Sequence, residues 1–201
     1  MSESVLCDGM PIEYVSDAAT LNALCLEWAS EEFLAVDTEF ERTSTFYARI
    51  GLLQIADSKC CYLVDPLSID DWSGFKQLLS SPSVTLVMHS CSEDLSLIQT
   101  FLGCLPVSLF DTQLAAAFLG IGFSISYQAL IEQLLGITVA KDETRSDWIK
   151  RPLTEKQIHY AAADVRYLLQ VREILSNQIE QKGKTNWLRA ESAQQLVNAQ
   201  R

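Results

Sequence analysis

Residues 33–40 read FLAVDTEF, and this run decides the expected fold. Its apolar half predicts a strand, because a short run of apolar residues between polar segments is typical of strands. Strand side chains two apart project from the same face, so Asp37 and Glu39 should leave one side together. Two like charges on an apolar strand repel and resist burial. A divalent cation with a preference for oxygen ligands would neutralise them, although a solvated edge strand explains the pair equally well.

Strands and helices alternate along the rest of the chain. Further strands are expected at 12–15, 50–56, 60–64, 85–89 and 109–110, and the polar link 57–59 suggests a hairpin. Helices are expected over about 17–29, 72–79, 92–101, 112–119, 126–135 and 154–181, with a short one in the tail after 185. Gly136 is placed to stop one helix, and Thr154 with Gln157 forms a capping box for another. This order predicts an α/β fold with a mixed sheet covered by helices.

Length and composition predict one domain spanning residues 1–201, with a motif-bearing core at about 30–180. The chain has 201 residues and is 48% hydrophobic, enough for one sizeable core. No apolar run reaches the ~20 residues of a membrane span, and the N-terminus lacks the features of a secretory signal. Six cysteines without a C-x-x-C pair indicate reduced thiols in a cytoplasmic protein.

The net charge of −11 argues against binding long duplexes by phosphate neutralisation alone. Bound divalent cations would add positive charge where a phosphate lies. A few basic residues also gather along the sequence: Arg42, Arg49, Arg145, Lys150 and Arg151. We therefore expect weak affinity for long nucleic acid unless a second module assists.

Further acids stand at positions where they could meet Asp37 and Glu39. Asp94 follows a predicted strand near the start of a helix, where the helix dipole favours an anion, and Glu93 beside it is an alternative. Tyr160 and Asp164 are four apart on a predicted helix and so share a face. The three alanines between them, 161–163, would let another element approach closely.

These motifs together resemble the DEDD family of 3′–5′ exonucleases, in its tyrosine-containing branch, and within that branch the ribonuclease D group. The first motif, Asp-x-Glu, matches Asp37 and Glu39. The second matches Asp94 in HSCSEDL and selects it over Glu93, and the third, Tyr-x-x-x-Asp, matches Tyr160 and Asp164. The resemblance covers roughly residues 30–170. Fuller ribonuclease D proteins continue into helical accessory domains implicated in RNA binding, and this chain ends before them.

The resemblance implies a ribonuclease H-like fold and a metal-dependent 3′–5′ exoribonuclease. Its products would be nucleoside 5′-monophosphates from RNA 3′ ends, and its task the processing of tRNA or other structured RNA. Asp37, Glu39 and Asp164 would hold one Mg²⁺ or Mn²⁺. Asp37 and Asp94 would hold a second ion about 4 Å away, and Tyr160 would orient the attacking water.

Three residues are candidates for contact with the substrate. Gln54 is expected to reach the terminal nucleotide or to be a solvated strand residue. Phe40, or Tyr47, would stack on a terminal base, with core packing as the alternative, and Arg145 would meet a phosphate. His89 and His159 are expected to be structural. The family segment also includes Asp111, Asp147 and Trp148. Of these, only Asp111 has an expected role, as a helix cap.

Two other functions remain open at this stage. A scavenger of very short oligoribonucleotides would suit the acidic composition, and a non-catalytic nucleic-acid-binding module could use the same scaffold. The presence of all five motif residues argues against the second, because a dead scaffold has no need for crowded acids. A serine or cysteine hydrolase is disfavoured, since no nucleophile-elbow motif is present. The sequence predicts no oligomeric state.

Overall fold

A mixed β-sheet forms the centre of the protein. The computed structural model describes residues 5–41, 47–141 and 143–201. Within these residues, seven strands follow the order β1-β2-β5-β4-β3-β6-β7. Their bounds are Leu6–Cys7 for β1, Met10–Val15 for β2, Phe33–Glu41 for β3, Arg49–Ala56 for β4, Cys61–Val64 for β5, Thr85–Met88 for β6 and Leu109–Asp111 for β7. The centre β3-β4-β5 is antiparallel, whereas β6 and β7 on one side and β2 on the other join in parallel.

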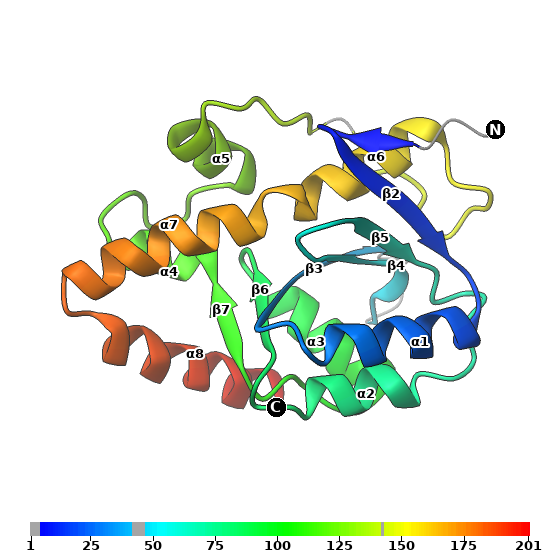
Figure 1. The fold of residues 1–201 in the computed structure, drawn as a ribbon, viewed down its shortest axis with the longest axis horizontal. Helices are drawn as coiled ribbons and strands as arrows, with labels where there is room; N and C mark the ends of the chain where they lie inside the picture. Colours follow the sequence, from blue (N-terminus) through cyan, green and yellow to red (C-terminus); the bar gives the residue numbers. More distant parts are fainter. Residues whose placement is uncertain (1–4, 42–46, 142) are drawn as a thin grey trace.

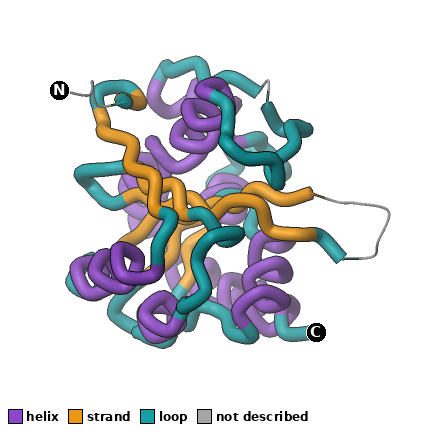
Figure 2. The backbone as a smooth tube through the Cα atoms, turned by 90° about the vertical axis from the view of Figure 1, so that its right-hand side faces the viewer, coloured by secondary structure: helices purple, strands orange, loops and turns teal. Residues whose placement is uncertain are grey.

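Helices cover both faces of this sheet, as the ribbon and the backbone tube show (Figure 1, Figure 2). The first layer contains α1 (Ala18–Trp28), α2 (Ser73–Leu79) and α3 (Ser92–Leu102). The second contains α4 (Thr112–Phe118), α5 (Tyr127–Leu135), α6 (Glu155–Arg166) and α7 (Leu168–Gln181). The last helix, α8 (Thr185–Ala199), packs against α3, α4, α7 and β7. The expected α/β architecture with a helix-covered mixed sheet is confirmed.

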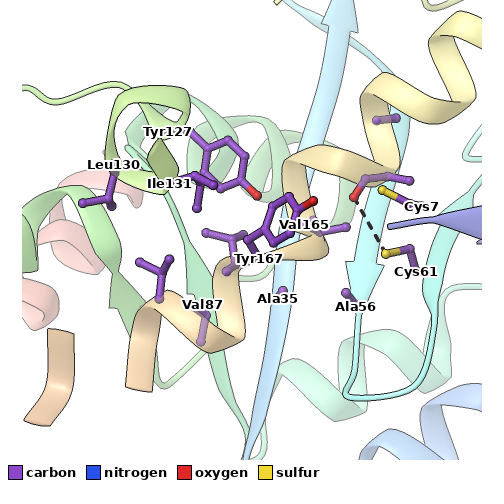
Figure 3. Close-up of a cluster of buried hydrophobic side chains, with 14 of the residues drawn as sticks. Cys7, Ala35, Ala56, Cys61, Val87, Tyr127, Leu130, Ile131, Val165 and Tyr167 are labelled. Carbon is purple, nitrogen blue, oxygen red and sulfur yellow. Dashed lines mark hydrogen bonds between the residues drawn. The ribbon is translucent and has the colours of Figure 1, made fainter. Parts of the chain in front are cut away.

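The pleat of β3 assigns its residues to two separate cores. Leu34 and Val36 pack in the core beneath α1, α2 and α3, whereas Ala35 packs in the core beneath α6 and α7. Figure 3 shows Ala35 and Ala56 in this second core, together with Val165 of α6. By the same alternation, Asp37 and Glu39 point toward α6, and the intervening Thr38 points toward α3.

The second half of β3 has a neighbouring strand on one side only. β3 pairs with β4 as far as Glu41, but with β6 only over Phe33–Ala35. After β6 the chain turns at Ser90, which has a positive φ of 56°, and enters α3. The acidic end of β3 therefore lies where the parallel half of the sheet separates from the antiparallel half. Its Glu39 is buried at 8% exposure, so the interpretation as a solvated edge strand is wrong.

Most predicted elements are present, but the expected long helix over 154–181 is two helices. The capping box of Thr154 and Gln157 opens α6 as predicted. Tyr167, with φ −111°, then separates α6 from α7. Its hydroxyl donates to Asp8 Oδ2 at 2.9 Å, and Arg166 donates to the Cys7 carbonyl at 3.2 Å. These contacts to β1, a two-residue strand too short to predict, and to the turn after it accompany the break.

The described residues hold no helix with the length and apolar character that crossing a bilayer requires. All six cysteines are free thiols.

Candidate active site

Three carboxylates meet between β3 and α6. Ligand oxygens of Asp37, Glu39 and Asp164 all lie within 4.8 Å of one another. Ala161 and Ala162, both completely buried, bring α6 close against the sheet, as the run of alanines predicted. The structure thus brings together the first and third motifs, which are more than a hundred residues apart in the sequence.

Asp94 approaches the same place from the other helical layer. It lies in the first turn of α3, where the helix dipole favours a carboxylate. The Thr38 hydroxyl donates a hydrogen bond to Asp94 Oδ1. Asp94 is buried, whereas the neighbouring Glu93 is exposed and lines a surface cavity. The geometry therefore favours Asp94 over Glu93, and Thr38, which the sequence analysis did not single out, joins the two motifs.

Asp111 holds the turn that places α3. It caps α4, as predicted, by accepting from Gln113 N at 2.9 Å. Its carboxylate also accepts from Ser90 N at 2.9 Å and Cys91 N at 3.1 Å. These bonds stabilise the left-handed conformation of Ser90, which a non-glycine residue rarely adopts. Asp111 therefore fixes the start of the helix that carries Asp94.

Burial and mutual repulsion dominate the electrostatics of the four acids. Burial, followed by the charges of Asp94, Asp164 and Glu39, raises the pKa of Asp37 well above its ordinary value. Burial and then the charge of Asp164 raise the pKa of Glu39 to about 9. Burial is also the main cause that raises the pKa of Asp94 and of Asp164 to about 7. No basic side chain is among the main causes for any of the four.

This site fits divalent cations. Every candidate ligand is a carboxylate oxygen, the type that Mg²⁺ and Mn²⁺ prefer. Asp164 Oδ1 is buried and has no hydrogen-bond partner within the described residues. Buried charges are normally paired or coordinate metals, so a cation would satisfy both this oxygen and the repulsion among the acids.

Gln54 has a different position from either one expected. It is completely buried in β4 opposite Asp37, and its Nε2 donates to Glu39 Oε1 at 3.1 Å. Both the solvated alternative and a direct contact with a nucleotide disagree with this burial. The sequence could not show it, because whether a strand residue is covered depends on the helix that packs over it. Gln54 instead orients Glu39.

Tyr160 lies one helical turn before Asp164 and is buried at 9% exposure. Its hydroxyl lies 2.9 Å from the Thr144 hydroxyl. The ring of Trp148 packs against it at 5.9 Å between centroids, tilted by 35°. Burial raises the pKa of Tyr160, so it remains a neutral phenol. This state suits a hydrogen-bonding role better than proton abstraction.

The segment over Tyr160 is anchored by Arg151. This arginine donates to both carboxylate oxygens of Asp65, at 3.0 and 2.9 Å, and to the Trp148 carbonyl at 2.7 Å. A Cβ on Gly51 would lie 2.6 Å from that carbonyl oxygen, so only glycine allows this close approach. Arg151 was counted among basic residues for phosphate contact; the structure pairs it with Asp65 instead.

The remaining candidates lie around the site. Phe40 and the exposed Tyr47 line a cavity of about 370 Å³ beside the first turns of α3. Arg145 is exposed and follows Thr144 in the chain, and Arg42 lies outside the described residues. His89 bonds Thr112 Oγ1 and the Ile125 carbonyl, each at 2.8 Å, which agrees with a structural role. The other residues of the family segment are structural, since Trp148 is fully buried and Asp147 accepts from two backbone amides.

Comparison with known proteins identifies the family of this chain. A family profile described as "3′-5′ exonuclease" matches residues 12–180, which is most of the chain. The chain belongs to this exonuclease family. It is similar to ribonuclease D of Pseudomonas paraeruginosa, at 46% identity over 187 residues, covering 93% of this chain and 50% of the relative. Ribonuclease D of Escherichia coli is 42% identical over 181 residues, covering 90% and 48%.

Solved structures agree with the family assignment. A crystal structure of Escherichia coli RNase D, described as an exoribonuclease involved in structured RNA processing, matches with a TM-score of 0.93 and 39% identity. It covers 96% of this chain and 51% of that one. Brucella melitensis NrnC matches with a TM-score of 0.81 at 22% identity, covering 94% and 91%, which shows the fold alone. The ribonuclease H-like exonuclease fold is confirmed, and the chain spans about half the length of the curated relatives it matches.

Proposed function

We propose that this exonuclease-family chain is a metal-dependent 3′–5′ exoribonuclease that releases nucleoside 5′-monophosphates from RNA 3′ ends. The observation that carries the proposal is the cluster of Asp37, Glu39 and Asp164, with Asp94 and Tyr160 beside it. Four crowded acids with no basic side chain among the main causes of their pKa shifts are costly unless a ligand compensates them. The likeness to ribonuclease D supports the choice of RNA.

Each site residue has a task in this proposal. Asp37, Glu39 and Asp164 would hold one divalent cation, Mg²⁺ or Mn²⁺, and Asp37 with Asp94 a second. Such ions lower the pKa of a bound water and stabilise the charge that develops on the leaving oxygen. Tyr160 hydrogen-bonds the attacking water and so aims it at the terminal phosphodiester. Gln54 and Thr38 hold Glu39 and Asp94 in place.

The substrate would approach along the open end of β3. Phe40 and Tyr47 would stack on bases, which tolerates any sequence, and Arg145 would contact a phosphate. The natural substrate in this proposal is structured RNA such as a tRNA precursor. Short oligoribonucleotides are the second candidate, since a net charge of −11 offers little attraction for a long phosphate backbone. In this proposal the chain forms one domain. It is located in the cytoplasm, where thiols stay reduced.

The test is digestion of a 5′-labelled single-stranded RNA with Mg²⁺ or Mn²⁺, beside EDTA and Asp37→Asn controls. A ladder that shortens from the 3′ end and disappears in both controls is expected. Intact RNA with either metal, from folded protein, would overturn the proposal in favour of a binding module. The same assay on oligoribonucleotides from the dinucleotide upward, against a tRNA with a 3′ extension, separates the two substrate classes.

A further inference from the structure

Thr144 makes two hydrogen bonds, one of them to Tyr160. The Thr144 hydroxyl lies 3.0 Å from the Lys141 carbonyl and 2.9 Å from the Tyr160 hydroxyl. A carbonyl only accepts, and a threonine hydroxyl has a single proton to donate. Both Thr144 contacts are satisfied at once when Thr144 donates to the Lys141 carbonyl and accepts from Tyr160, in competition with the Asp164 carboxylate, which also accepts from Tyr160. In this arrangement the Tyr160 proton points at Thr144, and the phenol oxygen is free to accept.

We propose that Thr144 is a positioning residue for Tyr160, setting its hydroxyl so that the oxygen lone pairs, and not the proton, face the attacking water. The inference rests on the proposed function. In this arrangement the water donates one hydrogen to Tyr160 and presents its own lone pair to the phosphate. Tyr160 keeps its proton throughout, so neither hydroxyl gains or loses one.

Packing alone does not determine the position of the Tyr160 ring. Trp148 supports one side. Another side borders a cavity of about 630 Å³ that lies between α6, β1 and the residues Thr138, Val139, Ala140 and Glu143. A ring beside such a space has room to tilt, because missing neighbours mean missing contacts. The hydrogen bond to Thr144 supplies the restraint that packing omits there.

The segment that carries Thr144 is itself held at nearby points. Gln157 Nε2 donates to Ser146 Oγ at 2.7 Å and to the Asp147 carbonyl at 3.0 Å, and Arg151 anchors Trp148. Because these anchors do not use Thr144, removing its hydroxyl should leave the segment in place. Ser146 supplies a matched control, since its hydroxyl anchors the same segment through Gln157.

Steady-state kinetics with Mg²⁺ on a labelled RNA test the proposal. Thr144→Val should lower kcat about tenfold, the equivalent of one hydrogen bond, with KM nearly unchanged, and Thr144→Ser should restore most of it. In a Tyr160→Phe background, Thr144→Val should cause no further loss, because the group it positions is gone. Ser146→Ala should leave kcat near the wild-type value.

A metal-free readout tests the hydrogen bond directly. In protein with ¹³Cζ-labelled tyrosine, the Tyr160 signal, assigned by its absence in Tyr160→Phe, should shift in Thr144→Val and stay in Ser146→Ala. An unchanged kcat or an unshifted signal in Thr144→Val would overturn the proposal. Thr144→Val lowering kcat equally in the wild-type and Tyr160→Phe backgrounds would also overturn it. So would an equal loss of kcat in Ser146→Ala, since either result indicates that the whole segment has become less ordered. Inactivity of the wild type would instead overturn the proposed function, while the metal-free signal would still test the hydrogen bond.

Discussion

Buried carboxylates occur at two sites in this sheet, and their pKa values shift in opposite directions. Asp65, at the end of β5, accepts hydrogen bonds from Tyr14, Leu67 N and both sides of the Arg151 guanidinium. Burial acts to raise its pKa, but the bonds from Arg151 and Tyr14 outweigh burial and hold the pKa below its ordinary value. In the cluster around Asp37 and Asp164, burial outweighs the hydrogen bonds that act to lower the pKa, and the pKa values rise.

The difference separates an acid whose charge the chain itself stabilises from acids whose ionised form burial disfavours. The carboxylate of Asp65 is satisfied by its own chain, and it anchors the segment that covers Tyr160. The cluster receives hydrogen bonds from Gln54 and Thr38 but no cationic partner among the main causes of its pKa shifts, and perturbed pKa values of this kind are typical of functional sites. Four experiments test this contrast.

The largest effect is expected from Asp37→Asn. Loss of a charged ligand should lower kcat about a thousandfold, or ~4 kcal/mol of transition-state stabilisation. The metal-free variant should unfold at a higher denaturant concentration than wild type, because one source of repulsion is removed. Digestion kinetics and urea titration in EDTA measure the two quantities. Wild-type turnover by the pure variant would show that Asp37 is not a metal ligand.

The pH dependence of metal-free stability comes next. The pKa values of Asp94 and Asp164 rise to about 7 in the folded protein and that of Glu39 to about 9, from ordinary values of 3.8 and 4.5. The folded state therefore holds these protons more tightly than the unfolded state. Its free energy of unfolding should fall as pH rises through this window, from about 4 toward 9.

Excess Mg²⁺ should reverse the trend, because it binds the ionised acids of the folded state. Asp65 contributes with the opposite sign, and its stabilisation is lost only as pH falls below about 4. Urea titrations at several pH values, with EDTA or with Mg²⁺, measure both effects. Asp37→Asn is the control and should show a shallower slope; greater metal-free stability at high pH would contradict the assignment.

The same substitution at the other acid, Asp65→Asn, should have the reverse consequence for stability. It leaves the partly buried Arg151 without its charged partner, so the free energy of unfolding should fall by about 2 kcal/mol. Lys150→Gln, at an exposed neighbour of Arg151, is the control and should be nearly neutral. If Asp65→Asn proved as stable as wild type, the ion pair would not be what anchors this segment.

Tyr160→Phe should have the smallest effect of the four and separates orientation from charge. It keeps the ring against Trp148 and removes only the hydroxyl. We expect kcat to fall about tenfold, with Mn²⁺ affinity by calorimetry unchanged. Equal turnover in wild type and variant would return Tyr160 to a packing role.

Local patterns predicted the elements because their causes are local. The capping box at Thr154, the cap at Asp111 and the stop at Gly136 each depend on a few adjacent residues. The break at Tyr167 was missed because it coincides with contacts to Asp8 and Cys7, far away in the chain. Gln54 was misplaced for the same reason, since α6 covers it.

The sequence alone determined which residue types the protein offers for chemistry. Asp37 and Glu39 share a face because strands alternate, and Tyr160 and Asp164 share a face because a helix turns every 3.6 residues. Only the tertiary structure decided that these faces meet, that Asp94 reaches them through Thr38, and that Arg151 is paired with Asp65. Some of those contacts join segments more than a hundred residues apart. The geometry of a single strand or helix cannot predict them.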